Sequence, residues 1–328
     1  MKFPTIFLFL LLSGVSIATS AETELGNKDF RVKIAGPEEI PRLEKEYRPR
    51  FDLCGTPSSI RIHGREFLLP PGLADEFGIM GTPPGFQENG IGTLFLKIGV
   101  GILENNRQGE YFFYHPYPVR NFFATTVKKG TNSMEFRQSG QFMTCSYDYC
   151  KTYTIRPEQK QLIIHYSLKN NGTEPIITAQ YNHNFFSLKQ NPRNSDVQIR
   201  TKFLPELKSF TGRGCFTAEG HLCKNLKTTK QGCYLVSTSP IRPEDNLFEL
   251  SDPVSPILIR IRGDFPSSRF AVSFKENSFI SPEIFLEIHL APGEQLQWKR
   301  IYEFLPTPQD TRSGKEKTDW NRQKKNRM

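Results

Sequence analysis

The 328-residue chain is predicted to be an all-β protein built from stacked antiparallel sheets. It contains 27 Phe and 11 Tyr, residue types that favour strands, and 24 Gly and 24 Pro, which end short runs. The sequence shows no repeat of fixed period and no long amphipathic helix. The best helical segment, "PEEIPRLEKEYR" (37–48), is interrupted by Pro41 and predicts an N-terminal arm or a single short helix.

Three segments carry the clearest strand patterns. The run "GTLFLKIGVGIL" (92–103) is continuously apolar, as expected of a strand covered on both faces. Residues 161–188 contain two β runs joined at Asn170, Asn171 and Gly172, which is a hairpin signal. Residues 282–305 contain two more runs, joined at Pro292 and Gly293. Long strands without intervening helices imply stacked sheets.

The N-terminus has the layout of a cleavable signal peptide over residues 1–20, with Lys2 ahead of the apolar block "IFLFLLLSGV" and small residues after it. The mature protein is therefore expected to begin near residue 21 and to be exported to the periplasm or the extracellular space. No later segment approaches the roughly 20 apolar residues that a membrane-spanning helix needs, so no membrane span is expected.

The C-terminal tail, residues 307–328, carries seven Lys/Arg and three Asp/Glu, nearly half of the chain's net charge of +9. Such a basic, polar tail is expected to be disordered and solvated. No zinc finger, RNP-like aromatic motif or basic helix accompanies it. A nucleic-acid partner is therefore not expected.

The six cysteines are an even number without a C-x-x-C pair, which favours disulfides over a zinc site in an exported protein. They are Cys54, Cys145, Cys150, Cys215, Cys223 and Cys233. The first expected pair is Cys145 with Cys150, and the other four are expected to pair among themselves in an order that the spacing leaves open.

One histidine lies in the middle of a strand pattern that ends in aromatic residues, "QYNHNFFSL" (180–188). Strand alternation places His183 with Tyr181 and Phe185 on one face, and Asn182 with Asn184 on the other. A histidine on the more apolar face fits a packing role as well as a catalytic one. The role of Glu283 is also undecided at this point, because alternation along "EIFLEIHL" (283–290) permits a solvated side chain as well as a functional one.

Several motifs, in order along the chain, resemble the aldose 1-epimerase (galactose mutarotase) superfamily. "NHNFFSL" (182–188) resembles the strand that carries its catalytic histidine, and "SPEIFLEIHLAPGEQLQWKRIYEF" (281–304) resembles its catalytic-glutamate strand. The upstream segments "FDLCGTPSSIRIHGREFLLP", "GLADEFGI" and "LFLKIGVGIL" look like an exported or uncharacterised bacterial branch of that superfamily.

The resemblance implies an antiparallel β-supersandwich over residues 48–306, preceded by an N-terminal arm (21–47), with a monosaccharide on the concave sheet face. His183 would be the general acid and Glu283 the general base that open the sugar ring and close it to the other anomer. Both side chains would point into one pocket, far enough apart to straddle a pyranose ring. This chemistry requires neither a metal nor a cofactor, and neither is expected.

The sequence also departs from the galactose enzymes, whose additional active-site histidine and early "NR" pair have no clear counterpart. His115 is the candidate for the additional imidazole, with packing between aromatic residues as the alternative. Glu76 is a candidate sugar contact, with an exposed loop carboxylate as the alternative. Asn182, beside the histidine, is a further candidate for binding the substrate.

The expected function is therefore interconversion of the anomers of a free or glycan-terminal sugar. The alternative is a non-catalytic exported protein that binds carbohydrate. A polysaccharide lyase of the supersandwich type is disfavoured, because such enzymes add a helical domain for which this chain has no room. The glycines between 72 and 101 form no dinucleotide-binding or P-loop pattern, so phosphate-cradling loops are not expected.

Overall fold

The computed structural model describes residues 23–47, 49–52, 55–78, 82–187, 197–211, 216–225, 232–252, 255–275 and 278–307. The expected signal peptide, Cys54, Cys215 and the basic tail beyond Thr307 lie outside these residues. None of the helices in the described part of the chain is long and apolar enough to cross a membrane.

Antiparallel strands account for most of the described chain, as predicted from its aromatic, Gly- and Pro-rich composition. The largest sheet has ten strands, which are, in spatial order, β16 (Phe216–Glu219), β17 (Leu222–Asn225), β14 (Gln198–Thr201), β19 (Leu247–Ser251), β20 (Ile257–Gly263), β24 (Gln295–Pro306), β12 (Gln161–Asn170), β11 (Cys145–Arg156), β10 (Ser133–Phe142) and β9 (Thr125–Lys129).

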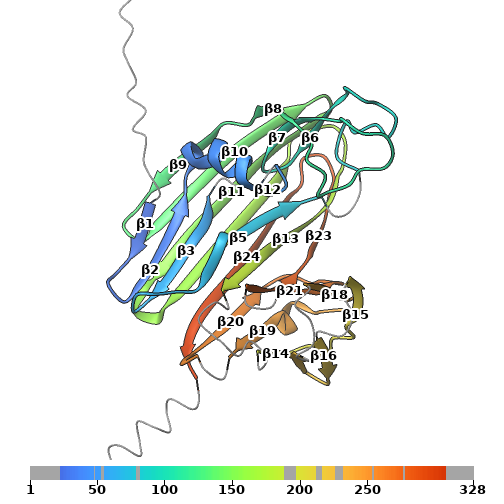
Figure 1. Ribbon diagram of the computed structural model, residues 1–328. Coiled ribbons are helices and arrows are strands. Elements are labelled where there is room, and N and C mark those ends of the chain that lie inside the picture. Colours follow the sequence, from blue (N-terminus) through green and yellow to red (C-terminus); the bar gives the residue numbers. More distant parts are fainter. Residues whose placement is uncertain are drawn as a thin grey trace, which may run out of the picture.

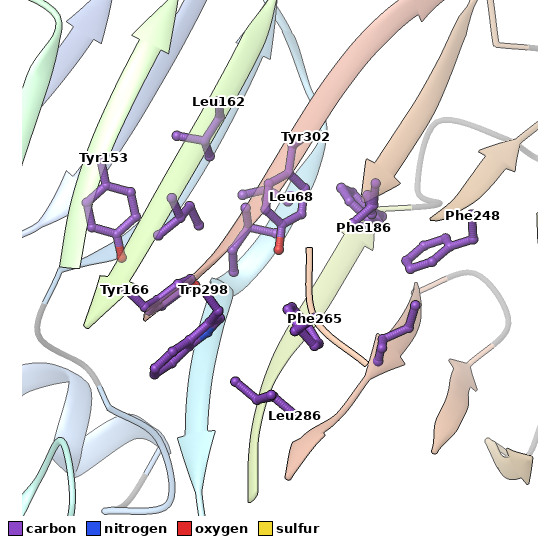
Figure 2. Packing of buried hydrophobic residues seen from close by; sticks show 14 of the residues in the cluster. Leu68, Tyr153, Leu162, Tyr166, Phe186, Phe248, Phe265, Leu286, Trp298 and Tyr302 are labelled. Atoms are coloured by element: carbon purple, nitrogen blue, oxygen red, sulfur yellow. The ribbon is translucent and has the colours of Figure 1, made fainter. Parts of the chain in front are cut away.

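A seven-stranded sheet forms the second layer. Its strands are β15 (Lys208–Thr211), β18 (Cys233–Ser237), β21 (Phe270–Lys275), β22 (Phe279–Ile284), β13 (Ile176–Ser187) and β23 (Leu286–Leu290), with β5 (Leu68–Phe77) paired to β13. Side chains from the two sheets meet in one hydrophobic core. Figure 2 shows Tyr153, Leu162, Tyr166 and Tyr302 of the ten-stranded sheet facing Leu68, Phe186 and Leu286 of the other.

Two smaller sheets, one α-helix and the short 3-10 helices η1 (Pro37–Glu39), η2 (Pro157–Gln159) and η4 (Pro243–Asp245) also belong to the described structure. The four-stranded sheet consists of β1 (Thr23–Gly26), β2 (Phe30–Ala35), β3 (Thr56–Ile62) and β4 (Arg65–Glu66), and the three-stranded sheet of β6 (Leu94–Lys97), β7 (Gly101–Glu104) and β8 (Val119–Phe122). The helix α1 (Ile40–Tyr47) coincides with the helical segment expected from the sequence.

Strands within the expected N-terminal arm pack against the folded core. Strand β2 pairs with β3, and Phe30 is fully buried with its ring 5.7 Å from that of Phe304 in the last strand. Figure 1 shows β1, β2 and β3, in blue, alongside the long strands of the main sheets. Along "FRVKIA" (30–35), the alternate residues Phe30, Val32 and Ile34 are buried, as in a sheet that packs one face on a core.

The two runs joined at Asn170–Gly172 are strands, but they do not form a hairpin with each other. Strand β12 pairs with β11 and β24, whereas β13 pairs with β5, β22 and β23. The connection crosses from one layer to the other, and the buried Asn170 side chain holds it by donating to the carbonyl oxygens of Glu174 and Leu290. The runs joined at Pro292–Gly293 are likewise split between the layers, as β23 and β24.

The apolar run 92–103 is not one strand but the hairpin of β6 and β7. The turn lies at Ile98–Val100, where Gly99 has a φ of +80° and a Cβ atom would lie 2.8 Å from the Cβ of Asp52. Only glycine combines this backbone conformation with so close a neighbour. Hydropathy alone could not show the break, because the turn residues Ile98 and Val100 are themselves apolar and buried.

The expected disulfide between Cys145 and Cys150 is absent, since both residues are free thiols. They lie five positions apart on β11, so their side chains point to opposite faces of an extended strand and cannot approach. Cys223 is also free, whereas Cys233 is disulfide-bonded.

Candidate functional site

A cavity of about 360 Å³ lies against the seven-stranded sheet and contains His183; we call it the histidine cavity. Its walls combine aromatic rings with charged groups and hydroxyls, a mixture suited to a small polar ligand. The lining residues are Arg50, Phe113, Tyr114, Tyr181, His183, Phe185, Phe210, Thr211, Tyr234, Ser273, Phe279 and Glu283.

Strand β13 carries His183 at a point where its ladder is interrupted on one side. The strand pairs with β23 as far as Gln180 and with β22 from Phe186 onward. Between these positions, the backbone N–H of Asn184 donates to Ser281 Oγ at 2.8 Å, and its Nδ2 donates to the Pro282 carbonyl at 2.5 Å. These bonds replace part of the missing ladder. His183 of β13 and Glu283 of β22 meet at this opening.

His183 has a carboxylate oxygen at each ring nitrogen. Nδ1 lies 2.9 Å from Oε1 of Glu283, and Nε2 lies 2.8 Å from Oε2 of Glu76. Only the doubly protonated imidazolium can donate to both carboxylates at once. Burial by itself lowers the pKa of His183, but the charges and hydrogen bonds of Glu283 and Glu76 outweigh it, so that the pKa is raised.

Glu76 is fully buried and accepts hydrogen bonds from three donors. Its Oε2 accepts from Arg50 Nε at 2.9 Å, from the Tyr181 hydroxyl and from His183. Burial alone would raise the pKa of this carboxyl, but Arg50 and His183 outweigh burial and lower the pKa to about 2. Glu76 therefore stays ionised at neutral pH and anchors the imidazole.

Glu283 keeps one oxygen available. Its Oε1 accepts a hydrogen bond from the Ser281 hydroxyl at 2.8 Å, whereas its Oε2 is buried and has no hydrogen-bond partner among the described residues. Because buried carboxylate oxygens are rarely left without a donor, this atom is a natural acceptor for a ligand hydroxyl in the cavity.

Aromatic side chains hold the imidazole ring of His183 in place. Phe185 stacks on it with ring centroids 5.4 Å apart, and Phe51 meets it edge to face at 5.0 Å. Tyr181 lies on its third side, 4.6 Å away. The two aromatic positions beside His183 on the same face of β13 therefore orient the ring, and the sequence alternation had placed them there.

The structure brings His183, Glu283 and Glu76 together but spaces them differently from the expectation. The acid and the base were expected to straddle a pyranose ring, whereas His183 and Glu283 are in direct hydrogen-bond contact. Glu76 is an interior partner of His183 and does not line the histidine cavity. The two carboxylates meet the same imidazole from opposite ring nitrogens, which linear sequence could not reveal.

Two of the expected substrate contacts lie elsewhere. Asn182 points to the opposite face of β13, where its side chain donates to Asp75 at 3.0 Å and accepts from the Tyr302 hydroxyl at 2.7 Å. Adjacent residues of a strand face opposite sides, so Asn182 cannot share a pocket with His183. His115 packs against Tyr117 and lies 2.8 Å from Asn106 Oδ1, outside the cavity.

The polar face of β13 is buried in an interior network behind the site. Asp75 Oδ1 accepts from Tyr166, Gln180 and Asn182, and Lys151 lies 3.4 Å from Asp75 Oδ2. Buried polar groups that are satisfied in this way fix one arrangement of the strands that carry them. The network thus fixes β5 and β13, from which Glu76 and His183 project to the other side.

Arg50 and most of the aromatic wall were not identified from the sequence. Arg50 follows helix α1 in a turn without periodic pattern, and contacts Glu76, Tyr181 and His183 only through the tertiary fold. Its guanidinium also lies 5.2 Å from the ring centre of Phe113. In the described residues, no group of three or more His, Cys, Asp or Glu side chains is arranged to hold a metal ion.

No family model and no curated protein sequence matches the chain. Solved structures, however, match nearly all of it. A galactose mutarotase-like protein from Lactobacillus casei superposes with a TM-score of 0.55 at 14% identity, covering 87% of this chain and 100% of its own. A galactose mutarotase related enzyme from Lactobacillus acidophilus gives 0.56 at 11% identity, covering 88% and 98%.

The aldose epimerase homologue from C. elegans is also similar, with a TM-score of 0.52 at 11% identity, covering 88% of this chain and 100% of that one. These identities are low, whereas the coverage is nearly complete in both directions. The chain therefore has the antiparallel β-supersandwich fold of the galactose mutarotase-like proteins.

Proposed function

We propose that the protein interconverts the anomers of a free or glycan-terminal sugar, with His183 as general acid and Glu283 as general base. The observation that carries this proposal is the His183–Glu283 pair in a cavity with aromatic walls, where the second oxygen of Glu283 accepts no hydrogen bond from a described residue. Aromatic faces suit the C–H surfaces of a sugar ring, and the polar groups suit its hydroxyls.

The close spacing of the two groups is compatible with this chemistry. Opening a cyclic hemiacetal requires a proton on the ring oxygen while the anomeric hydroxyl loses its own, and both oxygens are bonded to the same carbon. When a sugar places this carbon between His183 and Glu283, the hydrogen bond between the two side chains is replaced by two others. One runs from His183 to the ring oxygen, and the other runs from the anomeric hydroxyl to Glu283. His183 donates its Nδ1 proton to the ring oxygen, and Glu283 accepts the hydroxyl proton. Reversal of both transfers after rotation closes the other anomer.

Glu76 and Arg50 have supporting roles in this proposal. Glu76 stays at Nε2 of His183 throughout, because Arg50 and Tyr181 hold it. A fixed carboxylate at one ring nitrogen orients the imidazole and stabilises its protonated form, so that the other nitrogen works as the acid. We further propose, from the signal-like N-terminus, that the protein acts outside the cytoplasm.

The proposal is tested by following anomer exchange of several aldoses by NMR, with the wild type and the variants His183→Asn and Glu283→Gln. Each variant keeps size and some hydrogen bonding but removes a proton transfer, so we expect exchange to slow by about 10²–10⁴-fold with sugar binding largely retained. The matched controls are His115→Asn and Glu287→Gln, which lie outside the histidine cavity and are expected to exchange at the wild-type rate.

Non-catalytic sugar binding is the second candidate, and one observation favours it: both nitrogens of His183 are occupied by carboxylates. If the wild type binds a sugar but never accelerates its anomer exchange, His183 is a binding residue and this second function replaces the first. A wild type that neither binds nor exchanges any sugar contradicts both.

A further inference from the structure

A second cavity, of about 430 Å³, lies at the end of β5. We call it the lysine cavity, because Lys97 lines it. Its walls come from the end of β5, residues 82–85 and 96–98, Tyr111, the turn before β11 and the start of β13. Lys97 Nζ lies 4.0 Å from Oε1 of Glu76, whose Oε2 contacts His183. Glu76 thus contacts a lining residue of each cavity, and the two cavities share none of the lining residues that the structure describes.

The ammonium of Lys97 has one carboxylate near it among the described residues, Oε1 of Glu76 at 4.0 Å, which is the outer limit of an ion pair. The side chain of Lys97 is only 4% exposed, and it makes no hydrogen bond to any described residue. The hydrogen bonds of Glu76 to Arg50, His183 and Tyr181 all use Oε2, and Oε1, the oxygen nearer Lys97, accepts none from a described residue. A buried charge without a close partner is costly. Accordingly, burial together with the charge of Arg50 outweighs Glu76 and lowers the pKa of Lys97 to about 8.

A second polar group in the same cavity also lacks a hydrogen bond to any described residue. The hydroxyl of Tyr111 is buried, and no described residue forms a hydrogen bond with it. Lys97 and Tyr111 thus offer an ammonium and a hydroxyl donor from two separate parts of the chain. A carboxylate, with two acceptor oxygens and a single negative charge, would satisfy both.

The rest of the lysine cavity defines the body of the ligand. Phe77, Ile98 and Ile176 are buried apolar side chains of its wall, and Ile177, at 53% exposure, extends this surface outward. The carboxylate of Glu174, which is exposed, lies at the solvent side and disfavours a second negative charge there.

We propose that the lysine cavity binds a small organic monocarboxylate with an apolar body, its carboxylate paired with Lys97 and hydrogen-bonded by Tyr111. This site is separate from the histidine cavity and does not depend on the function proposed for it. The ligand is anchored at its charged end by the buried ammonium, and its hydrocarbon part covers the apolar wall.

The test compares two isosteric probes, hexanoate and hexanamide, by calorimetric titration of the wild-type protein at pH 7. Hexanoate is expected to bind with a Kd on the order of 1 mM, as suits a ligand of this size. Hexanamide, which lacks the charge, is expected to bind at least about tenfold more weakly. Equal affinity for the two probes, or no binding of hexanoate, would overturn the proposal. Inorganic phosphate, an anion without an apolar body, is expected to bind more weakly than hexanoate; tighter binding would also overturn it.

Substitutions of the lining residues test whether hexanoate binds in the lysine cavity. Lys97→Met is expected to abolish the preference for hexanoate, whereas the matched substitution Lys128→Met, at an exposed position of β9, is expected to leave it unchanged. Tyr111→Phe should weaken hexanoate by about threefold to tenfold, the value of one hydrogen bond. Full hexanoate affinity in Lys97→Met would show that the anion binds elsewhere.

The pH dependence of the wild type gives a test that needs no variant. Lys97 loses its charge as the pH rises through about 8, while Glu76 and Arg50 keep theirs. Tyr111 and the Cys145 thiol stay neutral because burial raises the pKa of each. Hexanoate affinity should therefore fall between about pH 7 and about pH 9, and hexanamide affinity should not. A pH-independent hexanoate affinity would contradict the role of Lys97.

Discussion

Arg50, Glu76 and Glu283 surround His183, and their contacts decide what each group can do. Arg50 and His183 both contact Oε2 of Glu76, so this carboxylate remains charged without access to solvent. Glu283 contacts the other ring nitrogen of His183, and each carboxylate has one oxygen without a hydrogen bond to a described residue. Of the two carboxylates beside His183, Glu283 is the one that lines the histidine cavity.

Because the pKa of Glu76 is lowered in the folded protein, the free energy of unfolding of the wild type is expected to fall at low pH. The folded pKa of Glu76, about 2, lies below its ordinary value of 4.5. The stabilisation is therefore complete above about pH 4.5 and is lost as the pH falls toward 2, and the shift is worth about 3 kcal/mol. Urea unfolding at several pH values should show this loss in the wild type and in Glu287→Gln, but not in Glu76→Gln. Parallel pH profiles for the wild type and Glu76→Gln would contradict the pairing.

At the scale of elements, β13 serves both layers because its alternate residues have different partners. Tyr181, His183 and Phe185 form the wall of the histidine cavity, whereas Gln180 and Asn182 join the interior network. At the N-terminus, the buried face of strand β2 completes the core beneath β24.

Truncation of Phe30 tests whether β2 belongs to the core. Phe30→Ala removes a fully buried ring that packs on Phe304, so we expect it to reduce the free energy of unfolding by about 3–5 kcal/mol. The same substitution at Phe210, which is 77% exposed, should change it by less than about 0.5 kcal/mol. Equal effects in urea unfolding would mean that the N-terminal strands are a dispensable arm.

At the scale of the whole molecule, one hydrophobic cluster connects the four-, seven- and ten-stranded sheets. It includes Phe30 from the first, Phe186 from the second and Trp298 from the third. Contacts between residues far apart in the chain dominate such an arrangement, so the sheets stabilise one another.

We therefore expect the sheets to unfold together. Trp298 stacks on Tyr166 with ring centroids 5.0 Å apart and reports on the ten-stranded sheet. In a Trp320→Phe variant, which leaves Trp298 as the only tryptophan of the sequence, its fluorescence and the far-UV circular dichroism should change at the same urea concentration. Two separated midpoints would show that the sheets unfold independently.

The sequence by itself determined the class of the fold and one face of the site. Alternation along 176–185 placed His183 with Tyr181 and Phe185, because the side-chain period of a strand is a local property. The order of several motifs, each short, indicated the supersandwich. Aromatic composition and Gly/Pro spacing, which are also local signals, indicated antiparallel strands.

Only the tertiary structure decided which strands pair and which charges meet. The runs around Asn170–Gly172 carry a hairpin signal, yet they belong to different layers, because pairing depends on burial of both faces and not on the turn alone. Glu76, Glu283 and Arg50 are far apart in sequence, and nothing in their local patterns distinguishes a solvated charge from a buried one. Lys97 likewise has the local pattern of an ordinary strand residue, and only the tertiary fold buries its ammonium 4.0 Å from Oε1 of Glu76.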